Sequence, residues 1–156
     1  MKKYFLLILI LSGAGVWWAQ DVKHRVSGAT DTAAVATAVK QDLSYVQIND
    51  VKIPVEIVQT QAEVEKGLSG WASLDSKSGM LFIFSKPDYY RFWMPDMNFP
   101  IDIIWINENQ IVGISPDVSN EFDPANPKFY TPPRPADNVL EVNAGWAADH
   151  NIKIGD

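Results

Sequence analysis

The sequence predicts a mainly β fold for residues 43–156, an antiparallel β-sandwich or barrel-like roll with one or two short helices. Three observations predict this class. About seven apolar segments of strand length are separated by turn residues. Only two stretches carry helix signals, and both are short. Six of the ten prolines lie between Pro116 and Pro135, and a segment so poor in backbone donors favours a long surface loop.

The N-terminal segment has the layout of a secretory signal peptide. Two lysines precede an apolar run over residues 4–11, and small residues follow it. Cleavage after Ala14 satisfies the preference for small residues at the cleavage site. The alternative is an uncleaved membrane anchor with tryptophans 17 and 18 at the interface. Residues 1–19 are therefore predicted to be a signal peptide or an N-terminal membrane anchor, and the folded domain is predicted to be extracytoplasmic.

Residues 20–42 are predicted to be a disordered linker. The segment is polar or small, and residues 29–39 consist only of Ala, Thr, Val and Asp. No large apolar side chain is present there to offset the conformational entropy lost on ordering. A single folded domain is expected to follow, because 156 residues suffice for one core and not for two ordinary ones.

The first elements of this domain are a hairpin and a short helix. Residues 45–48 and 51–58 have the composition of two strands, and Asn49 and Asp50 between them both tolerate a positive φ. Thr60 followed by Glu63 is a capping box, which predicts that a helix begins there. Gly67 or Gly70 is expected to end that helix.

The central strands are predicted from continuous apolar runs. Residues 80–84 form one such run, and residues 99–106 are apolar on both faces apart from one carboxylate. A turn over residues 107–110 leads to a returning strand at 111–115. Further elements are expected in the C-terminal part: a long loop over 116–135, a strand at 139–142, a helical turn within 144–150, and a last short strand containing Ile152 and Ile154.

Composition excludes several kinds of chemistry. The chain has no cysteine and two histidines, so a thiolate nucleophile, a disulfide framework and a Cys-ligated metal are absent, and His150 alone cannot build a triad. Asp117, Glu121 and Asp123 lack the glycine and the spacing of a calcium loop. No cofactor and no metal are therefore predicted. Residues 43–156 carry 8 basic and 16 acidic residues, a net charge of −8, which disfavours nucleic acid as a partner.

Three carboxylates are candidates for catalysis: Asp102, Asp96 and Glu141. Asp102 stands inside an otherwise apolar strand, where a carboxylate has to be paired, hydrogen-bonded or neutralised. It is interpreted either as a buried anchor that accepts backbone N–H groups or meets Arg91, or as an acid or base of raised pKa. A glycosidase needs two carboxyl groups about 5–10 Å apart, and spacing along the chain does not show that these three converge.

Four other residues are candidates for ligand binding: Arg91, Trp93, Tyr89 and Tyr130. If residues 91–94 are extended, Arg91 and Trp93 share a face and offer a stacking surface beside a hydrogen-bonding fork. The alternative is that the tryptophan belongs to the core and the arginine to its ion-paired rim.

Five motifs, in order, resemble the bacterial and archaeal family known as domain of unknown function 192. They lie between about Val51 and Gly155 and read Glu-Lys-Gly-Leu from residue 65, Gly-Met-Leu-Phe from 79, Phe-Trp-Met from 92, Pro-Ile-Asp-Ile-Ile from 100, and Val-Leu-Glu-Val-Asn-Ala-Gly from 139. The resemblance implies a jelly-roll-type β-sandwich. It implies no activity, because the family has none established.

The function expected from these features is that of an exported or membrane-tethered binding or interaction module of the cell envelope. The expected partners are a small molecule, a glycan or an envelope protein. The N-terminal segment is the expected tether to the membrane. The alternative is a carboxylate-based hydrolase of an envelope or extracellular polymer, so the question of enzyme activity stays open at this point. A third hypothesis is a purely structural envelope protein.

Overall fold

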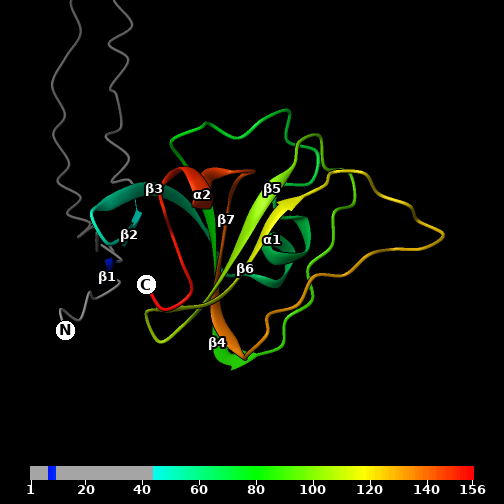
Figure 1. Ribbon diagram of the computed structural model, residues 1–156. Coiled ribbons are helices and arrows are strands. Elements are labelled where there is room, and N and C mark those ends of the chain that lie inside the picture. The colour runs from blue at the N-terminus through cyan, green and yellow to red at the C-terminus, as the bar shows by residue number, and fades with distance from the viewer. Residues whose placement is uncertain (1–6, 10–43) are drawn as a thin grey trace, which may run out of the picture. The chain divides into compact units, whose positions relative to one another are not determined.

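The computed structural model describes residues 7–9 and 44–156 and confirms the mainly β fold class. Seven strands form one mixed sheet in the spatial order β1-β2-β3-β4-β7-β5-β6, curled into a half-barrel (Figure 1). The predicted barrel-like roll is therefore closer to the structure than the predicted β-sandwich is. The elements are β1 (Leu7–Leu9), β2 (Tyr45–Ile48), β3 (Val51–Val58), α1 (Gln61–Lys66), β4 (Gly79–Asp88), β5 (Ile101–Asn107), β6 (Gln110–Val118), β7 (Ala136–Asn143) and α2 (Trp146–Asp149).

The predicted signal peptide or anchor and the predicted linker lie outside the described residues, except that β1 falls within the first of them. β1 pairs antiparallel with β2. Within the part of the chain that the structure describes, no helix has the length and apolar character needed to cross a membrane.

Tight turns join two antiparallel pairs as the sequence predicts. Asn49 adopts a φ of 53° between β2 and β3. Glu108 and Asn109 adopt φ values of 49° and 66° between β5 and β6. Two consecutive positive φ values are the signature of a type I′ turn, whose twist matches that of the flanking strands.

The pairing of β3 with β4 is parallel, and α1 lies in the connection between them, as parallel neighbours require. The predicted capping box opens this helix. The Thr60 hydroxyl accepts the Glu63 N–H at 3.3 Å, and the Glu63 carboxylate accepts the Thr60 N–H at 2.9 Å. Gly67, with a φ of 46°, ends the helix because this backbone conformation costs glycine little.

The sheet buries a separate apolar cluster on each face. Because side chains alternate along a strand, residues 101, 103 and 105 of β5 face one cluster and residues 104 and 106 the other. α2 packs against one face, through Trp146 and Ala147, whereas α1 and the long loops cover the other (Figure 1). A ligand site on either face is therefore built by the elements that cover that face.

Two long connections are joined to each other over the second face. Phe92 lies between β4 and β5, and Tyr130 lies in the loop from β6 to β7, drawn in yellow and orange in Figure 1. The N–H of each donates to the carbonyl of the other, at 2.9 and 2.8 Å. This bridge holds residues 91–94 against the loop from β6 to β7. The proline-rich loop begins after Val118, because Pro116 is still part of β6, where an irregularity in the pairing accommodates it.

The predicted last strand at Ile152 and Ile154 is wrong. Asn151 and Gly155 adopt φ values of 55° and 99°, so the chain turns where a strand would extend. Residues 155 and 156 still pair with Ile111 through two backbone hydrogen bonds of 2.9 Å each. The C-terminus is therefore anchored beside β6 without regular strand geometry.

Replacing Gly113 with alanine should lower the free energy of unfolding by about 2 kcal/mol, as overpacking commonly does. A Cβ on Gly113 would overlap the rigid ring of Pro133 and would lie 3.2 Å from Trp105. Urea denaturation of the full-length chain measures the effect. Gly70→Ala is the matched control, because a Cβ there meets nothing within 4 Å and only the strain of a left-handed backbone, about 1 kcal/mol, is expected. Equal losses in the two variants would show that Pro133 does not pack on β6 as described.

Candidate functional site

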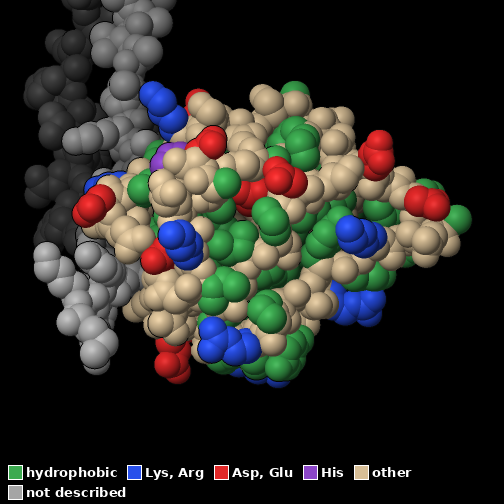
Figure 2. Space-filling view, in the orientation of Figure 1, with side chains coloured by type: hydrophobic (Ala, Val, Ile, Leu, Met, Phe, Trp, Pro, Cys, Tyr) green, Lys and Arg blue, Asp and Glu red, His purple; other side chains and the backbone are tan. Residues whose placement is uncertain are grey.

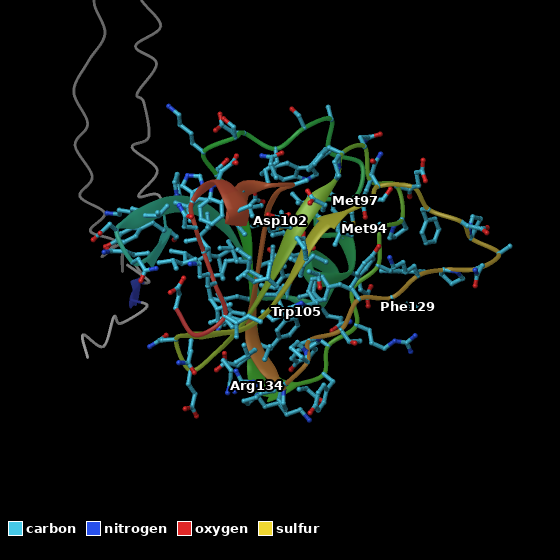
Figure 3. All side chains as sticks on the ribbon, in the orientation of Figure 1. Met94, Met97, Asp102, Trp105, Phe129 and Arg134 are labelled. Carbon is cyan, nitrogen blue, oxygen red and sulfur yellow. The ribbon has the colours of Figure 1, made fainter. Side chains whose placement is uncertain are left out.

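One pocket of about 240 Å³ opens on the sheet face that α1 covers. It is lined by α1 and the turn that follows it, by residues 91–97 except Asp96, and by Phe82 and Glu141. We call it the Glu141 pocket. Its walls mix apolar and polar groups: Leu68, Phe82 and Met94 contribute buried apolar side chains, and α1 with the turn after it contributes polar ones. Met97 also lines the pocket, and Figure 3 shows it beside Met94.

Glu141 is the exceptional group of this pocket. It lies in the middle of β7 between Met80 of β4 and Ile103 of β5, and its exposed fraction is 6%. No hydrogen bond from residues 44–156 reaches its carboxyl group. The only fully enclosed side-chain polar atom without a partner in that range is Asn107 Oδ1, so the Glu141 oxygens still reach the pocket. A buried carboxyl group that faces a cavity and lacks a protein partner is available to a ligand.

Burial raises the pKa of Glu141 from 4.5 to about 8. The cause is desolvation, because a charged carboxylate loses its hydration in this apolar surrounding. At neutral pH the group is therefore mostly protonated and presents one O–H donor together with acceptor capacity. Glu65, Lys66 and Arg91 are the charged residues that line the same pocket.

Arg91 and Trp93 are exposed residues of the pocket lining and form its mouth, where both contact Phe129 of the loop from β6 to β7. The guanidinium of Arg91 lies 3.9 Å from the ring centroid of Phe129, and Trp93 stacks on Phe129 at 5.7 Å with an interplanar angle of 11°. Arg91 and Trp93 therefore share a face, as their alternation predicts. Among the residues that the structure describes, no carboxylate lies within ion-pair distance of Arg91; the pair found is Lys86 with Asp88. The guanidinium N–H groups thus remain available at the mouth.

Asp102 lies on the opposite face of the sheet and is fully buried. Its register partner is Val142, whereas Ile103 pairs with Glu141, so alternation directs the two carboxylates to opposite faces. Asp102 Oδ1 accepts the N–H groups of Asp117 at 2.9 Å and Gly145 at 3.1 Å, and Oδ2 accepts that of Ala147 at 2.9 Å. In Figure 3 it lies beside α2, away from the pocket. This geometry corresponds to the anchor interpretation of Asp102.

The other predicted site residues lie at or beyond the rim. Asp96 is exposed, and its carbonyl, not its carboxylate, accepts a hydrogen bond, from the Gly70 N–H at 2.9 Å. Tyr130 holds residues 91–94 through its backbone bridge and lines a separate cavity of about 100 Å³. Tyr89 is exposed outside the pocket. The structure thus brings together Arg91, Trp93 and Glu141, and it leaves Asp96, Asp102, Tyr89 and Tyr130 outside.

The surface of the domain is mixed in character. Figure 2 shows hydrophobic side chains exposed among both acidic and basic ones on the visible face. In residues 44–156 the exposed large hydrophobic side chains are Tyr89, Trp93, Phe129 and Ile154. No group of three or more His, Cys, Asp or Glu side chains in the described ranges lies close enough together to hold a metal ion.

Two residues of the pocket wall were not predicted, and the burial of Glu141 was not predicted either. Met94 and Met97 look like ordinary core residues along the chain. Glu141 is flanked by Leu140 and Val142, a pattern that is typical of a strand with one solvent-facing side chain. Only the tertiary packing of α1 and residues 91–97 over β7 encloses it.

Comparison with known proteins identifies the family of the chain. The family model DUF192, described as "Uncharacterized ACR", matches residues 44–156. No curated protein matches the chain.

Two solved structures are similar to this chain. One is a protein of unknown function from Novosphingobium aromaticivorans, with 29% identity and a TM-score of 0.62 over 83% of this chain and 97% of that one. The other is described as a candidate transcription regulator from Sinorhizobium meliloti, with 24% identity and a TM-score of 0.61 over 72% of this chain and 82% of that one. At this identity the second likeness concerns the fold alone.

Proposed function

The chain belongs to the DUF192 family, and on that premise we propose that it is a non-catalytic binding module whose Glu141 pocket holds one small organic molecule. One observation carries the proposal: a carboxyl group 6% exposed lies in the pocket without a hydrogen bond from residues 44–156. A buried polar group without a partner costs free energy, about 1–3 kcal/mol. A ligand that pairs with Glu141 would remove that cost.

Binding is favoured over hydrolysis because the carboxylates do not converge. A glycosidase needs two carboxyl groups flanking one bond. Asp102 lies on the other face with both oxygens occupied, and Asp96 does not line the pocket. The observation that favours hydrolysis is the pKa of Glu141, raised by burial to about 8, which suits a general acid. A hydrolase that used Glu141 as its acid would need Glu65 as the second carboxylate. The Oε1 atom of Glu65 is already engaged, because it accepts a hydrogen bond from Gln61 at 2.7 Å.

We place this module outside the cytoplasm, secreted or tethered to the membrane. The apolar run at 4–11 and the linker composition of 20–42 support this location. Intact-mass measurement of the protein recovered from its host tests it. Cleavage after Ala14 would also remove β1 and leave β2 at the edge of the sheet. A full-length chain recovered in the cytosolic fraction would contradict export.

A fragment screen monitored by NMR should find ligands that perturb the Glu141 pocket, and Trp93→Ala should weaken them by about 30-fold. That factor corresponds to roughly 2 kcal/mol, the loss expected when an aromatic side chain that the ligand covers is truncated. Trp93 is 48% exposed, so its truncation leaves the core intact. Tyr89→Ala is the matched control, because Tyr89 is an exposed aromatic residue outside the pocket. A screen in which no fragment perturbs the pocket would contradict the proposed function.

A further inference from the structure

We infer that the Glu141 pocket selects a small organic anion: an apolar body with a hydrogen-bonding group at its inner end, facing Glu141, and a carboxylate at the mouth, facing Arg91. This inference rests on the proposed function and adds the chemical class of the ligand. Three features of the pocket support it, one at each depth.

At the inner end, the ligand has to offer an acceptor. The pKa of Glu141, raised by burial to about 8, keeps the carboxyl group protonated at neutral pH. A protonated carboxyl group donates one O–H and accepts through its other oxygen. A hydroxyl or carbonyl group on the ligand satisfies this pattern, whereas a carboxylate at the same depth would be desolvated beside apolar walls.

Along the buried part of the walls, the ligand needs an apolar group. Leu68, Phe82 and Met94 are buried there, and the thioethers of Met94 and Met97 adapt to flat or branched groups. A saccharide placed among them would lose the hydration of its hydroxyl groups without gaining partners. The volume of about 240 Å³ lies below the range typical of drug-sized sites. One aromatic ring or a short aliphatic chain therefore fits better than a sugar.

At the mouth, the ligand has to be anionic. The guanidinium of Arg91 lies over Phe129, and Trp93 stacks on the same ring. Stacking fixes the plane of the guanidinium, so that its edge can present a fork of N–H donors to a carboxylate. Lys66 also lines the pocket and adds a second positive charge, whereas Glu65 contributes one negative charge. An anion approaching a domain of net charge −8 needs such a local cation.

The test uses three probes that differ by one group each, with calorimetry on the full-length chain at pH 6.5. 4-Hydroxyphenylacetate carries the carboxylate, the ring and the inner hydroxyl. 4-Hydroxyphenylacetamide lacks the charge, and phenylacetate lacks the hydroxyl. A hydrogen bond to a charged group is worth roughly 1.5–3 kcal/mol, so the amide should bind about 10-fold to 100-fold more weakly than the carboxylate.

Arg91→Gln should abolish this preference for the carboxylate, while Arg134→Gln should preserve it, because Arg134 is an exposed basic residue that does not line the pocket. Glu141→Leu should remove the advantage of the hydroxyl probe over phenylacetate. Equal affinity of the wild-type protein for the carboxylate and the amide would overturn the inference and leave the proposed binding function standing. Absence of binding by all three probes would also overturn it, whereas the proposed function depends on the wider screen.

Discussion

Replacing Glu141 with glutamine should stabilise the folded domain at pH 7 by about 3 kcal/mol. Burial raises the pKa of Glu141 from 4.5 to about 8. At pH 7 the unfolded chain is ionised at this position, whereas the folded domain has to bind a proton there. Each pH unit between the unfolded pKa and pH 7 costs the folded state about 1.4 kcal/mol. Glutamine has a similar shape and stays neutral in both states, so it avoids this cost.

The pH dependence of the difference provides the check. Glu141 should make the free energy of unfolding of the wild-type protein fall as the pH rises from 4.5 toward 8, because unfolding releases a proton from Glu141 in that window. Glu141→Gln should lack this slope, so the two proteins should be about equally stable at pH 4. Urea denaturation at a series of pH values measures both. Glu56→Gln, at an exposed position in β3, should change stability by less than about 0.5 kcal/mol.

Glu141→Leu, which removes both the donor and the acceptor and also stays neutral, should weaken the hydroxyl-bearing probe. If replacing a residue raises the free energy of unfolding and weakens binding, that residue serves binding and destabilises the fold. Loss of stability in Glu141→Gln at pH 7 would instead mean that the carboxylate has a stabilising partner, and the pocket would then lack the open group on which the proposed function rests.

Replacing Asp102 with asparagine should lower the free energy of unfolding by about 3 kcal/mol. The carboxylate accepts three backbone N–H groups, from the β6 irregularity at Asp117 and from the start of α2 at Gly145 and Ala147. An amide has one acceptor oxygen, and its NH₂ group would face an N–H donor. Hydrogen bonds to charged groups are worth roughly 1.5–3 kcal/mol each, and a buried donor without a partner adds a penalty.

Thermal and urea denaturation measure the loss, and Asp96→Asn is the control, because Asp96 is an exposed aspartate whose side chain accepts no hydrogen bond from residues 44–156. Binding by the folded fraction of Asp102→Asn should equal that of the wild type, because Asp102 lies on the other face of the sheet. An unchanged melting temperature together with loss of any turnover would contradict this role and revive the hydrolase hypothesis.

Local signals in the sequence predicted most elements. The Thr60 capping box, the turn at 107–110 and the apolar runs that became β4 and β5 each depend on neighbours along the chain. Pairing across the sheet depends on distant segments, and no local signal indicates that β7 inserts between β4 and β5. The parallel pairing of β3 with β4 had a usable clue, since a helix lies between them.

The candidate site was harder to predict because burial at a single position depends on what covers it. Asp102 drew attention since it stands in a strand that is otherwise apolar on both faces, and it is an anchor for backbone N–H groups. Glu141 looked like the polar member of an alternating strand, yet α1 and residues 91–97 enclose it. Side chains alternate between the two faces along a strand, so the register of β5 against β7 places these carboxylates on opposite faces. That register cannot be predicted from either segment alone.

The most direct test of the proposed site is a titration of the Glu141 carboxyl group by NMR, with ¹³C-labelled glutamate and Glu141→Gln to assign the signal. The predicted result is a midpoint near pH 8 in the ligand-free protein, together with a shift of the same signal when 4-hydroxyphenylacetate is added at pH 6.5. A midpoint near the ordinary value of 4.5, with a signal that the probe leaves unmoved, would contradict the claim that Glu141 is a buried, neutral group open to a ligand.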